Sequence, residues 1–252
     1  MDRYGLIGYP LAHSFSAQFF NEKFKQEKID AEYLNFEIEQ IDDLPEIIAL
    51  NTHLRGLNVT IPYKETVLDF LDDISPIAKK IGAVNVIKVQ QLTKGSPDYQ
   101  LKGYNTDYIG FKHSLKPLID INHHCKALVL GTGGASKAVC VALDALGVEW
   151  TYVSRRPKQG AFTYSMLTRK MMEEYKIIIN TTPLGTYPDV EDAPTIPYEA
   201  LSSRHLLYDL VYNPAETAFL KKGNQMGAIT KNGAEMLRLQ ALAAWSIWTK
   251  SS

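Results

Sequence analysis

The chain of 252 residues has little cysteine, no excess of charge of one sign and no long apolar run. Its two cysteines, Cys125 and Cys140, are too far apart for the short paired spacing of zinc or redox motifs, so we expect reduced thiols and no metal site. The 27 basic and 28 acidic residues nearly cancel, which argues against a nucleic acid or an anionic membrane as partner. Without a membrane-spanning run or a signal-peptide pattern, we expect a cytoplasmic protein that binds a small molecule.

The first hundred residues alternate short apolar runs with helical patterns. The sequence predicts strands over residues 3–8, 31–36, 54–60, 85–91 and 99–103, and helices over residues 16–28, 41–50 and 65–71. Such alternation predicts crossover connections and a largely parallel sheet. The last two strands are joined by a polar turn over residues 93–98.

The second half of the chain predicts another α/β unit. Helical spacing over residues 107–116 ends at Pro117, and strands are expected near residues 127–130, 149–153, 176–179, 206–210 and 228–230. A final helix over residues 234–248 has a wide apolar stripe that predicts packing onto the first domain. We therefore expect an α/β protein with one domain over residues 1–106, completed by residues 234–252, and a Rossmann-like domain over residues 107–233.

A glycine-rich turn follows the apolar strand that ends at Leu130. Its residues are Gly131, Thr132, Gly133, Gly134 and Ala135. A strand, a glycine turn and a helix N-terminus form a site for a pyrophosphate, because backbone N–H groups approach the anion there. Glycine in such a turn can also serve packing alone, so the motif needs support from its context.

That context lies about twenty residues further on, where an NAD-binding protein has an acidic residue for the ribose hydroxyls. Here the sequence has Ser154, Arg155 and Arg156. Guanidinium groups suit a dianionic 2′-phosphate through charge-assisted hydrogen bonds. The sequence therefore favours NADP over NAD, although an isolated arginine pair is more often a solvated turn.

Three polar clusters precede the glycine turn: Ser14 and Ser16 at a helix start, residues 58–64 after a strand, and residues 105–107 before the linking helix. Each has a purely structural explanation as a helix cap or a turn. Together with a hydride carrier they suggest chemistry, because reduction of a ketone needs a proton donor for the developing alkoxide. Lys64, paired with the carboxylate of Asp107, is the candidate donor.

Motifs across nearly the whole chain resemble those of the shikimate dehydrogenase family. They occupy residues 8–16, 58–64, 82–85, 105–107, 131–135, 180–183, 209–214 and 233–240, in the family's order. The resemblance implies an α/β substrate domain and a Rossmann-like cofactor domain. It also implies NADPH-dependent, reversible reduction of 3-dehydroshikimate to shikimate, a late step of the chorismate and aromatic amino-acid route.

The resemblance also implies roles for individual residues. Lys64 would be the acid/base, with Asp107 beside it. The substrate would be bound by Ser14, Ser16, Thr60, Asn85, Asp107, Tyr212 and Gln240. Leu210 and Gly233 would line the nicotinamide, with Met236 closing that pocket, and residues 154–156 would hold the adenosine phosphate.

One segment departs from the family pattern. The family places a helix, a strand and a helix between the arginine turn and the strand that ends at Asn180, whereas only 23 residues separate Arg156 from Asn180 here. One crossover is therefore expected to be missing, which would leave the adenine side of the pocket more open.

Three alternatives to an NADP-specific shikimate dehydrogenase remain. A close variant would accept quinate or NAD. A ligand sensor on the same fold would bind without turnover, although the presence of both Lys64 and Asp107 argues against it. A methylenetetrahydrofolate dehydrogenase shares the cofactor half but does not explain Ser14, Ser16 and Gln240. The sequence leaves a monomer and a homodimer equally open.

Overall fold

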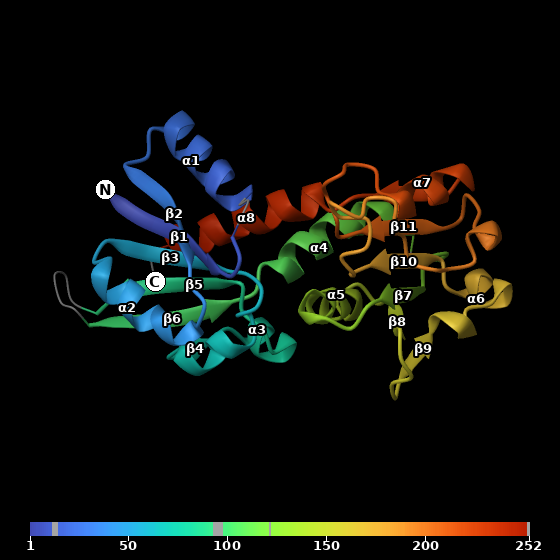
Figure 1. The fold of residues 1–252 in the computed structure, drawn as a ribbon, viewed down its shortest axis with the longest axis horizontal. Helices are drawn as coiled ribbons and strands as arrows, with labels where there is room; N and C mark the ends of the chain where they lie inside the picture. Colours follow the sequence, from blue (N-terminus) through green and yellow to red (C-terminus); the bar gives the residue numbers. More distant parts are fainter. Residues whose placement is uncertain (12–14, 93–97, 121, 251–252) are drawn as a thin grey trace. The chain divides into compact units, whose positions relative to one another are not determined.

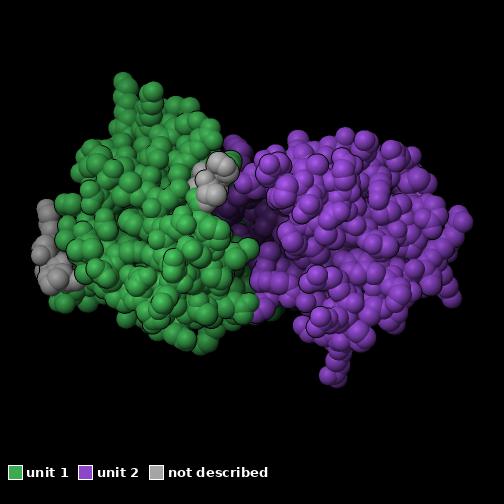
Figure 2. All heavy atoms as spheres, in the orientation of Figure 1, with its two compact units in different colours: residues 1–106, 241–252 green, residues 107–240 purple. Residues whose placement is uncertain are grey.

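The computed structural model describes residues 1–11, 15–92, 98–120 and 122–250. It divides into two compact units, coloured separately in Figure 2: unit 1 is Met1–Thr106 with Ala241–Ser252, and unit 2 is Asp107–Gln240. The final helix, α8 (Ala234–Thr249), contributes residues to both units. This division differs from the one drawn from the sequence at residues 234–240, which belong to unit 2.

Unit 1 is built on a six-stranded sheet with the order β2-β1-β3-β5-β6-β4 (Figure 1). The strands are β1 (Asp2–Gly8), β2 (Ala31–Glu37), β3 (Leu54–Val59), β4 (Asp73–Ile74), β5 (Val86–Gln91) and β6 (Tyr99–Tyr104). The α-helices are α1 (Phe15–Glu27), α2 (Leu44–Leu50) and α3 (Pro76–Ile81), with short 3-10 turns at Ile41–Asp43 and Thr66–Phe70.

The sheet of unit 1 is mixed. Strand β1 pairs in parallel with β2 and β3, and β4 with β6, whereas β3–β5 and β5–β6 are antiparallel. The β5–β6 pair is antiparallel because a short polar connection, most of it outside the described residues, joins the two strands directly. The sequence missed β4 and α3, which are too short to show a period.

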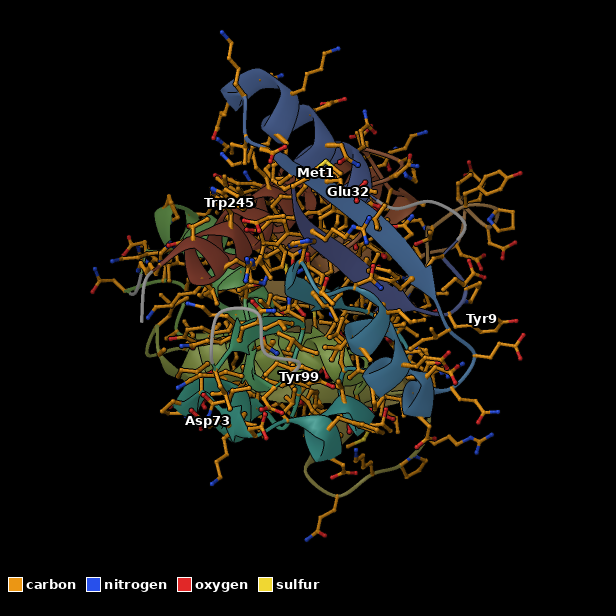
Figure 3. All side chains as sticks on the ribbon, turned by 90° about the vertical axis from the view of Figure 1, so that its left-hand side faces the viewer. Met1, Tyr9, Glu32, Asp73, Tyr99 and Trp245 are labelled. Atoms are coloured by element: carbon orange, nitrogen blue, oxygen red, sulfur yellow. The ribbon has the colours of Figure 1, made fainter. Side chains whose placement is uncertain are left out.

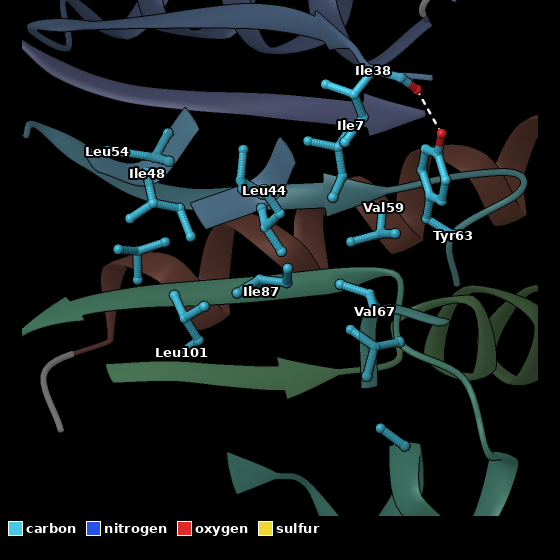
Figure 4. Packing of buried hydrophobic residues seen from close by; sticks show 14 residues of the cluster. Ile7, Ile38, Leu44, Ile48, Leu54, Val59, Tyr63, Val67, Ile87 and Leu101 are labelled. Atoms are coloured by element: carbon cyan, nitrogen blue, oxygen red, sulfur yellow. Dashed lines mark hydrogen bonds between the residues drawn. The ribbon is translucent and has the colours of Figure 1, made fainter. Parts of the chain in front are cut away.

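Apolar side chains fill unit 1 between the sheet and its helices. Ile7, Leu54 and Ile87 are at most 1% exposed and pack in the cluster of Figure 4. Burying one such side chain contributes about 2 kcal/mol. The Tyr63 hydroxyl donates to the carbonyl of Ile38 at 2.6 Å (dashed line in Figure 4), so it is buried with its partner.

The C-terminal part of α8 completes unit 1 on the other side of the sheet. Trp248 is 5% exposed and donates its indole N–H to the carbonyl of Ile87 at 3.0 Å. Its ring lies 5.0 Å from that of Tyr4 and 5.2 Å from that of Phe20, and Trp245, labelled in Figure 3, packs edge-on to Tyr4. The predicted return of the last helix to the first domain is confirmed.

Unit 2 is a parallel six-stranded sheet with the order β12-β11-β10-β7-β8-β9. Its strands are β7 (Lys126–Leu130), β8 (Glu149–Ser154), β9 (Ala161–Thr163), β10 (Ile177–Asn180), β11 (Leu206–Asp209) and β12 (Ile229–Lys231). Its helices are α4 (Asp107–Leu115), α5 (Gly134–Asp144), α6 (Arg169–Glu174), α7 (Ala218–Gln225) and the start of α8. Counted along the chain, this order is the 3-2-1-4-5-6 arrangement of a Rossmann sheet, so the predicted α/β class is confirmed.

The shortening seen in the sequence lies between β8 and β9. Residues 155–160 join these parallel strands and contain no helix, whereas parallel neighbours usually need a crossover of a dozen residues or more. The third strand of the Rossmann order survives as three residues that the sequence did not predict. Relative to the family pattern, unit 2 therefore lacks the helix between β8 and β9 but retains the strand β9.

Candidate active site

Three predicted residues of unit 1 gather where β3 ends. The amide of Thr60 donates to the carbonyl of Ile7 at 2.9 Å, which fixes Thr60 beside the end of β1. The carbonyl of Asn85 accepts from the amide of Val59 at 2.9 Å, and the carbonyl of Lys64 accepts from the amide of Val84 at 2.7 Å. The segment before β5 is therefore bound to the segment after β3. The structure brings Thr60, Lys64 and Asn85 together, with Thr60 and Lys64 half-buried and Asn85 buried.

A buried chain of polar groups runs behind this cluster. The Tyr33 hydroxyl donates to Asn58 Oδ1 at 2.7 Å, and Asn58 Nδ2 donates to the carbonyl of Asn85 at 3.3 Å. The Asn85 amide group in turn donates to Thr106 Oγ1 at 3.1 Å and accepts from the Thr106 N–H at 2.7 Å. These two bonds to Thr106, one donated and one accepted, hold the Asn85 side chain in one orientation, whereas Asn58 binds the backbone carbonyl of Asn85.

Ser16 joins the same chain at its other end. Burial raises the pKa of Tyr33 well above its usual value, and a side-chain hydrogen bond from Ser16 lowers it in part. Ser16 is half-buried in α1. Ser14 lies outside the described residues. The sequence did not single out Tyr33; the available signal was a tyrosine inside a predicted strand, and it is the one buried residue of β2.

The glycine turn of unit 2 has the form that an anion site requires. Gly131 has φ +100°, and a Cβ there would lie 2.9 Å from Thr182 Cγ2 and 3.0 Å from Thr181 Oγ1. Gly133 precedes α5 with extended backbone, and a Cβ there would meet nothing within 4 Å. Open space therefore lies at Gly133, just before the N-terminus of α5 with Gly134 and Ala135. The positive end of the helix dipole at this point suits a pyrophosphate.

The basic turn follows the neighbouring strand. Ser154 ends β8 and is half-buried, whereas Arg155 and Arg156 are exposed, and the amide of Arg156 donates to Ser154 Oγ at 3.4 Å. Because β8 is the parallel neighbour of β7, this turn and the glycine turn share the carboxyl edge of the sheet. Their side chains fit a phosphorylated ribose.

A buried polar network ties together the ends of β10 and β11. Asp209, fully buried, accepts from Asn180 Nδ2 at 2.9 Å, from the Val211 amide at 3.0 Å and from Thr217 Oγ1 at 2.6 Å. Asn180 Oδ1 accepts from the Thr182 hydroxyl at 2.6 Å. The network thus shapes the loop beside Gly131. Sequence reasoning gave Asn180 and Asp209 no role; the available signal was a polar residue closing an apolar strand.

Replacing Asp209 with asparagine is expected to change how stability depends on pH. Burial raises the pKa of Asp209 from 3.8 to about 6, despite hydrogen bonds that lower it. Between these values the folded protein retains a proton that the unfolded chain has lost, so wild-type stability falls as the pH rises through this window. A pKa shift of about two units corresponds to at most about 3 kcal/mol of stability. The asparagine of D209N does not titrate, so this pH dependence should be absent from the variant.

Urea titrations of both proteins from about pH 4 to about pH 7 measure this difference. The free energy of unfolding of the wild type, relative to D209N, should fall by about 2 kcal/mol over that range, which covers most of the titration. The exposed Asp189→Asn provides the matched control, whose curve should run parallel to that of the wild type. Parallel curves for D209N as well would show that Asp209 ionises normally in the folded protein.

The predicted nicotinamide-side residues lie together after β11. The amide of Gly233 donates to the carbonyl of Val211 at 3.1 Å, and a Cβ at Gly233 would lie 2.1 Å from the carbonyl oxygen of Leu210. Met236 is 8% exposed and packs in the same apolar cluster as Leu210. Only glycine permits this approach of α8 to the β11 loop.

The remaining predicted substrate residues belong to unit 2. Asp107 is the first residue of α4 and is buried, Gln240 is half-buried in α8, and Tyr212 is 43% exposed. A Cβ on Gly110 would lie 3.1 Å from Gln240 Cβ and 2.5 Å from the carbonyl of Met236, so α4 and α8 pack closely. The predicted substrate residues are therefore divided between the two units.

Two further observations concern the described part of the chain only. It contains no group of three or more histidine, cysteine, aspartate or glutamate side chains that could hold a metal ion. None of its helices is both long and apolar enough to span a bilayer.

The Rossmann strand order, the open glycine turn and the basic turn define a dinucleotide-binding α/β protein with a second α/β unit. A family model described as the shikimate dehydrogenase substrate binding domain matches residues 6–87. The shikimate dehydrogenase (NADP(+)) of Clostridium beijerinckii is 42% identical over 98% of this chain and 92% of its own length. This chain belongs to the shikimate dehydrogenase family.

Solved structures agree with this assignment. Shikimate dehydrogenase 1 from Peptoclostridium difficile is 38% identical with a TM-score of 0.78, covering 100% of this chain and 94% of its own. The shikimate 5-dehydrogenase of Thermus thermophilus, solved in complex with NADP(H) and shikimate, is 31% identical with a TM-score of 0.82, covering 99% and 94%.

Proposed function

We propose that this protein catalyses the NADPH-dependent, reversible reduction of 3-dehydroshikimate to shikimate, which supplies chorismate and aromatic amino-acid synthesis. The observation that carries the proposal is the similarity to NADP-dependent shikimate dehydrogenases over 98% of the chain, which includes both units. We further propose that it acts in the cytoplasm on small molecules, as a monomer or a homodimer.

In this proposal unit 1 is the substrate domain. Ser14 and Ser16 bind the substrate carboxylate, and Thr60 and Asn85 bind the ring hydroxyls. The hydrogen bonds that hold the Asn85 side chain support this role, because a fixed amide distinguishes the orientation of a hydroxyl group. Asp107, Tyr212 and Gln240 contribute substrate contacts from unit 2.

Unit 2 is the cofactor domain in this proposal. Residues 131–135 would hold the pyrophosphate, residues 154–156 the 2′-phosphate, and Leu210, Gly233 and Met236 the nicotinamide. The open space at Gly133 and the cationic turn after β8 support the fit of this cofactor. When bound, NADPH supplies the hydride.

Lys64 has the proton-transfer role. Reduction of the ketone places negative charge on its oxygen, and a lysine ammonium can donate a proton to that oxygen and take it back in the reverse direction. Asp107 contributes a carboxylate to the same reaction. The backbone bond between Lys64 and Val84 fixes the start of the lysine side chain beside Asn85.

Initial rates with shikimate or quinate, each combined with NADP or NAD, test the proposal. We expect the highest kcat/KM with shikimate and NADP. A preference for quinate with NAD would overturn both the substrate and the cofactor. Binding of shikimate without turnover in any combination would instead support a ligand sensor.

A further inference from the structure

The shortened connection after β8 places a second set of hydroxyl groups beside the basic turn. In the parallel β8–β9 pair, Ser154 is opposite Thr163, and neighbouring strands lie about 4.8 Å apart. Both strands end here, so Thr163 and Ser165 are at the carboxyl edge of the sheet together with Ser154. A crossover helix between the strands would have lengthened the chain between these residues; here only residues 155–160 join β8 to β9, and residues 155–162 separate Ser154 from Thr163.

The side chains of Ser154 and Thr163 belong to the face of the sheet that α5 covers. Val153 and Phe162 pack in the cluster of Met172, on one face. Tyr152 packs against the α5 residues Val139 and Cys140, on the other. Since side chains alternate along a strand, Ser154 and Thr163 share the face of Tyr152, and thus the face of the helix whose N-terminus follows the glycine turn.

The chemistry of these groups suits a phosphate. Thr163 Oγ1 and Ser165 Oγ lie 2.9 Å apart and share one hydrogen bond, so the hydroxyl that accepts keeps its own hydrogen for a further acceptor. Thr163 is half-buried and Ser165 is exposed. The positive charge of Arg155 acts on Tyr164, which lies between them in sequence, and lowers a pKa that burial raises. The turn over residues 154–160 contains three basic residues and no acidic one.

We propose that Thr163 and Ser165 form part of the 2′-phosphate subsite. They would bind the phosphate from the end of β9, while Ser154, Arg155 and Arg156 bind it from the end of β8. This inference rests on the proposed use of NADP and extends it to residues outside the family's motifs. The hydroxyl groups give the phosphate additional donors on the side of β9, and a cofactor without the 2′-phosphate makes no use of them.

Calorimetric titration with 2′,5′-ADP and with 5′-AMP tests the subsite without requiring turnover. The unaltered chain should bind 2′,5′-ADP more tightly than 5′-AMP. The double variant Thr163→Val with Ser165→Ala should raise the Kd of 2′,5′-ADP about tenfold, as expected for lost hydrogen bonds to a charged group, and leave that of 5′-AMP within about twofold. Thr151→Val is the matched control, because Thr151 lies in β8 and its hydroxyl is 3.3 Å from that of Tyr175.

An unchanged Kd for 2′,5′-ADP in the double variant would overturn the proposal. Equal weakening of both nucleotides would also overturn it, because it would mean that the two residues only support the fold of the adenosine site. If the unaltered chain did not prefer 2′,5′-ADP, the NADP assignment itself would fail, and that result is distinguishable because it needs no variant.

Discussion

Replacing Lys64 with alanine is expected to slow shikimate oxidation by about 10³-fold while the Kd for shikimate changes little. The loss is within the range for removal of a positioned acid or base. Binding should survive because the proposed contacts to the carboxylate and ring hydroxyls come from other residues, and because the backbone bond of Lys64 to Val84 does not depend on its side chain. Steady-state kcat and an independent shikimate titration separate the two effects.

The exposed Lys25→Ala, at the end of α1, is the matched control and should retain wild-type turnover. If the K64A variant turned over at the wild-type rate, the proton would have to come from another group. Loss of shikimate binding in proportion to the loss of rate would make Lys64 a binding residue rather than the acid/base.

Replacing Arg155 and Arg156 together with alanine is expected to weaken NADP binding by at least about 100-fold. Each guanidinium removed takes away a charge-assisted hydrogen bond, and two such bonds account for a change of this size or more. The affinity for NAD should change only a few-fold, because its ribose carries no phosphate. Titrations with both cofactors therefore measure a loss of preference rather than a general loss of binding.

The exposed Arg169→Ala on α6 removes a positive charge from unit 2 outside the proposed subsite and should leave both affinities near their wild-type values. An equal fall in NADP and NAD affinity in the double variant would contradict recognition of the 2′-phosphate by the turn.

The sequence predicted the strands with strong apolar runs correctly, because their burial dictates both composition and length. It predicted a helix at residues 65–71, where Thr66–Phe70 forms a 3-10 turn, and it missed the three-residue β9. Elements this short are formed by tertiary contacts: β9 exists because β8 offers an edge to pair with. A local sequence pattern contains no information about pairing with a distant strand, so it cannot predict such an element.

The site could be predicted where the type of a residue directly indicates what it binds. The glycine turn indicates close approach of the backbone to a pyrophosphate, and the arginine turn indicates a phosphate. It was not predictable where a residue acts through another. Tyr33 is far from Asn58 in sequence and meets it only because β1 brings β2 and β3 into one sheet. Asp209 likewise acquires its role only when β10 and β11 pair and bring it to Asn180.

Helix α8 has a consequence for the order in which the chain is completed. Residues 107–240 leave the ribosome before the segment that covers Tyr4 and Phe20, so unit 2 has all of its sequence while unit 1 still lacks Trp248. The part of the protein that is synthesised first is therefore finished last. Until residues 241–250 have been synthesised, unit 1 keeps the aromatic surface around Tyr4 and Phe20 uncovered.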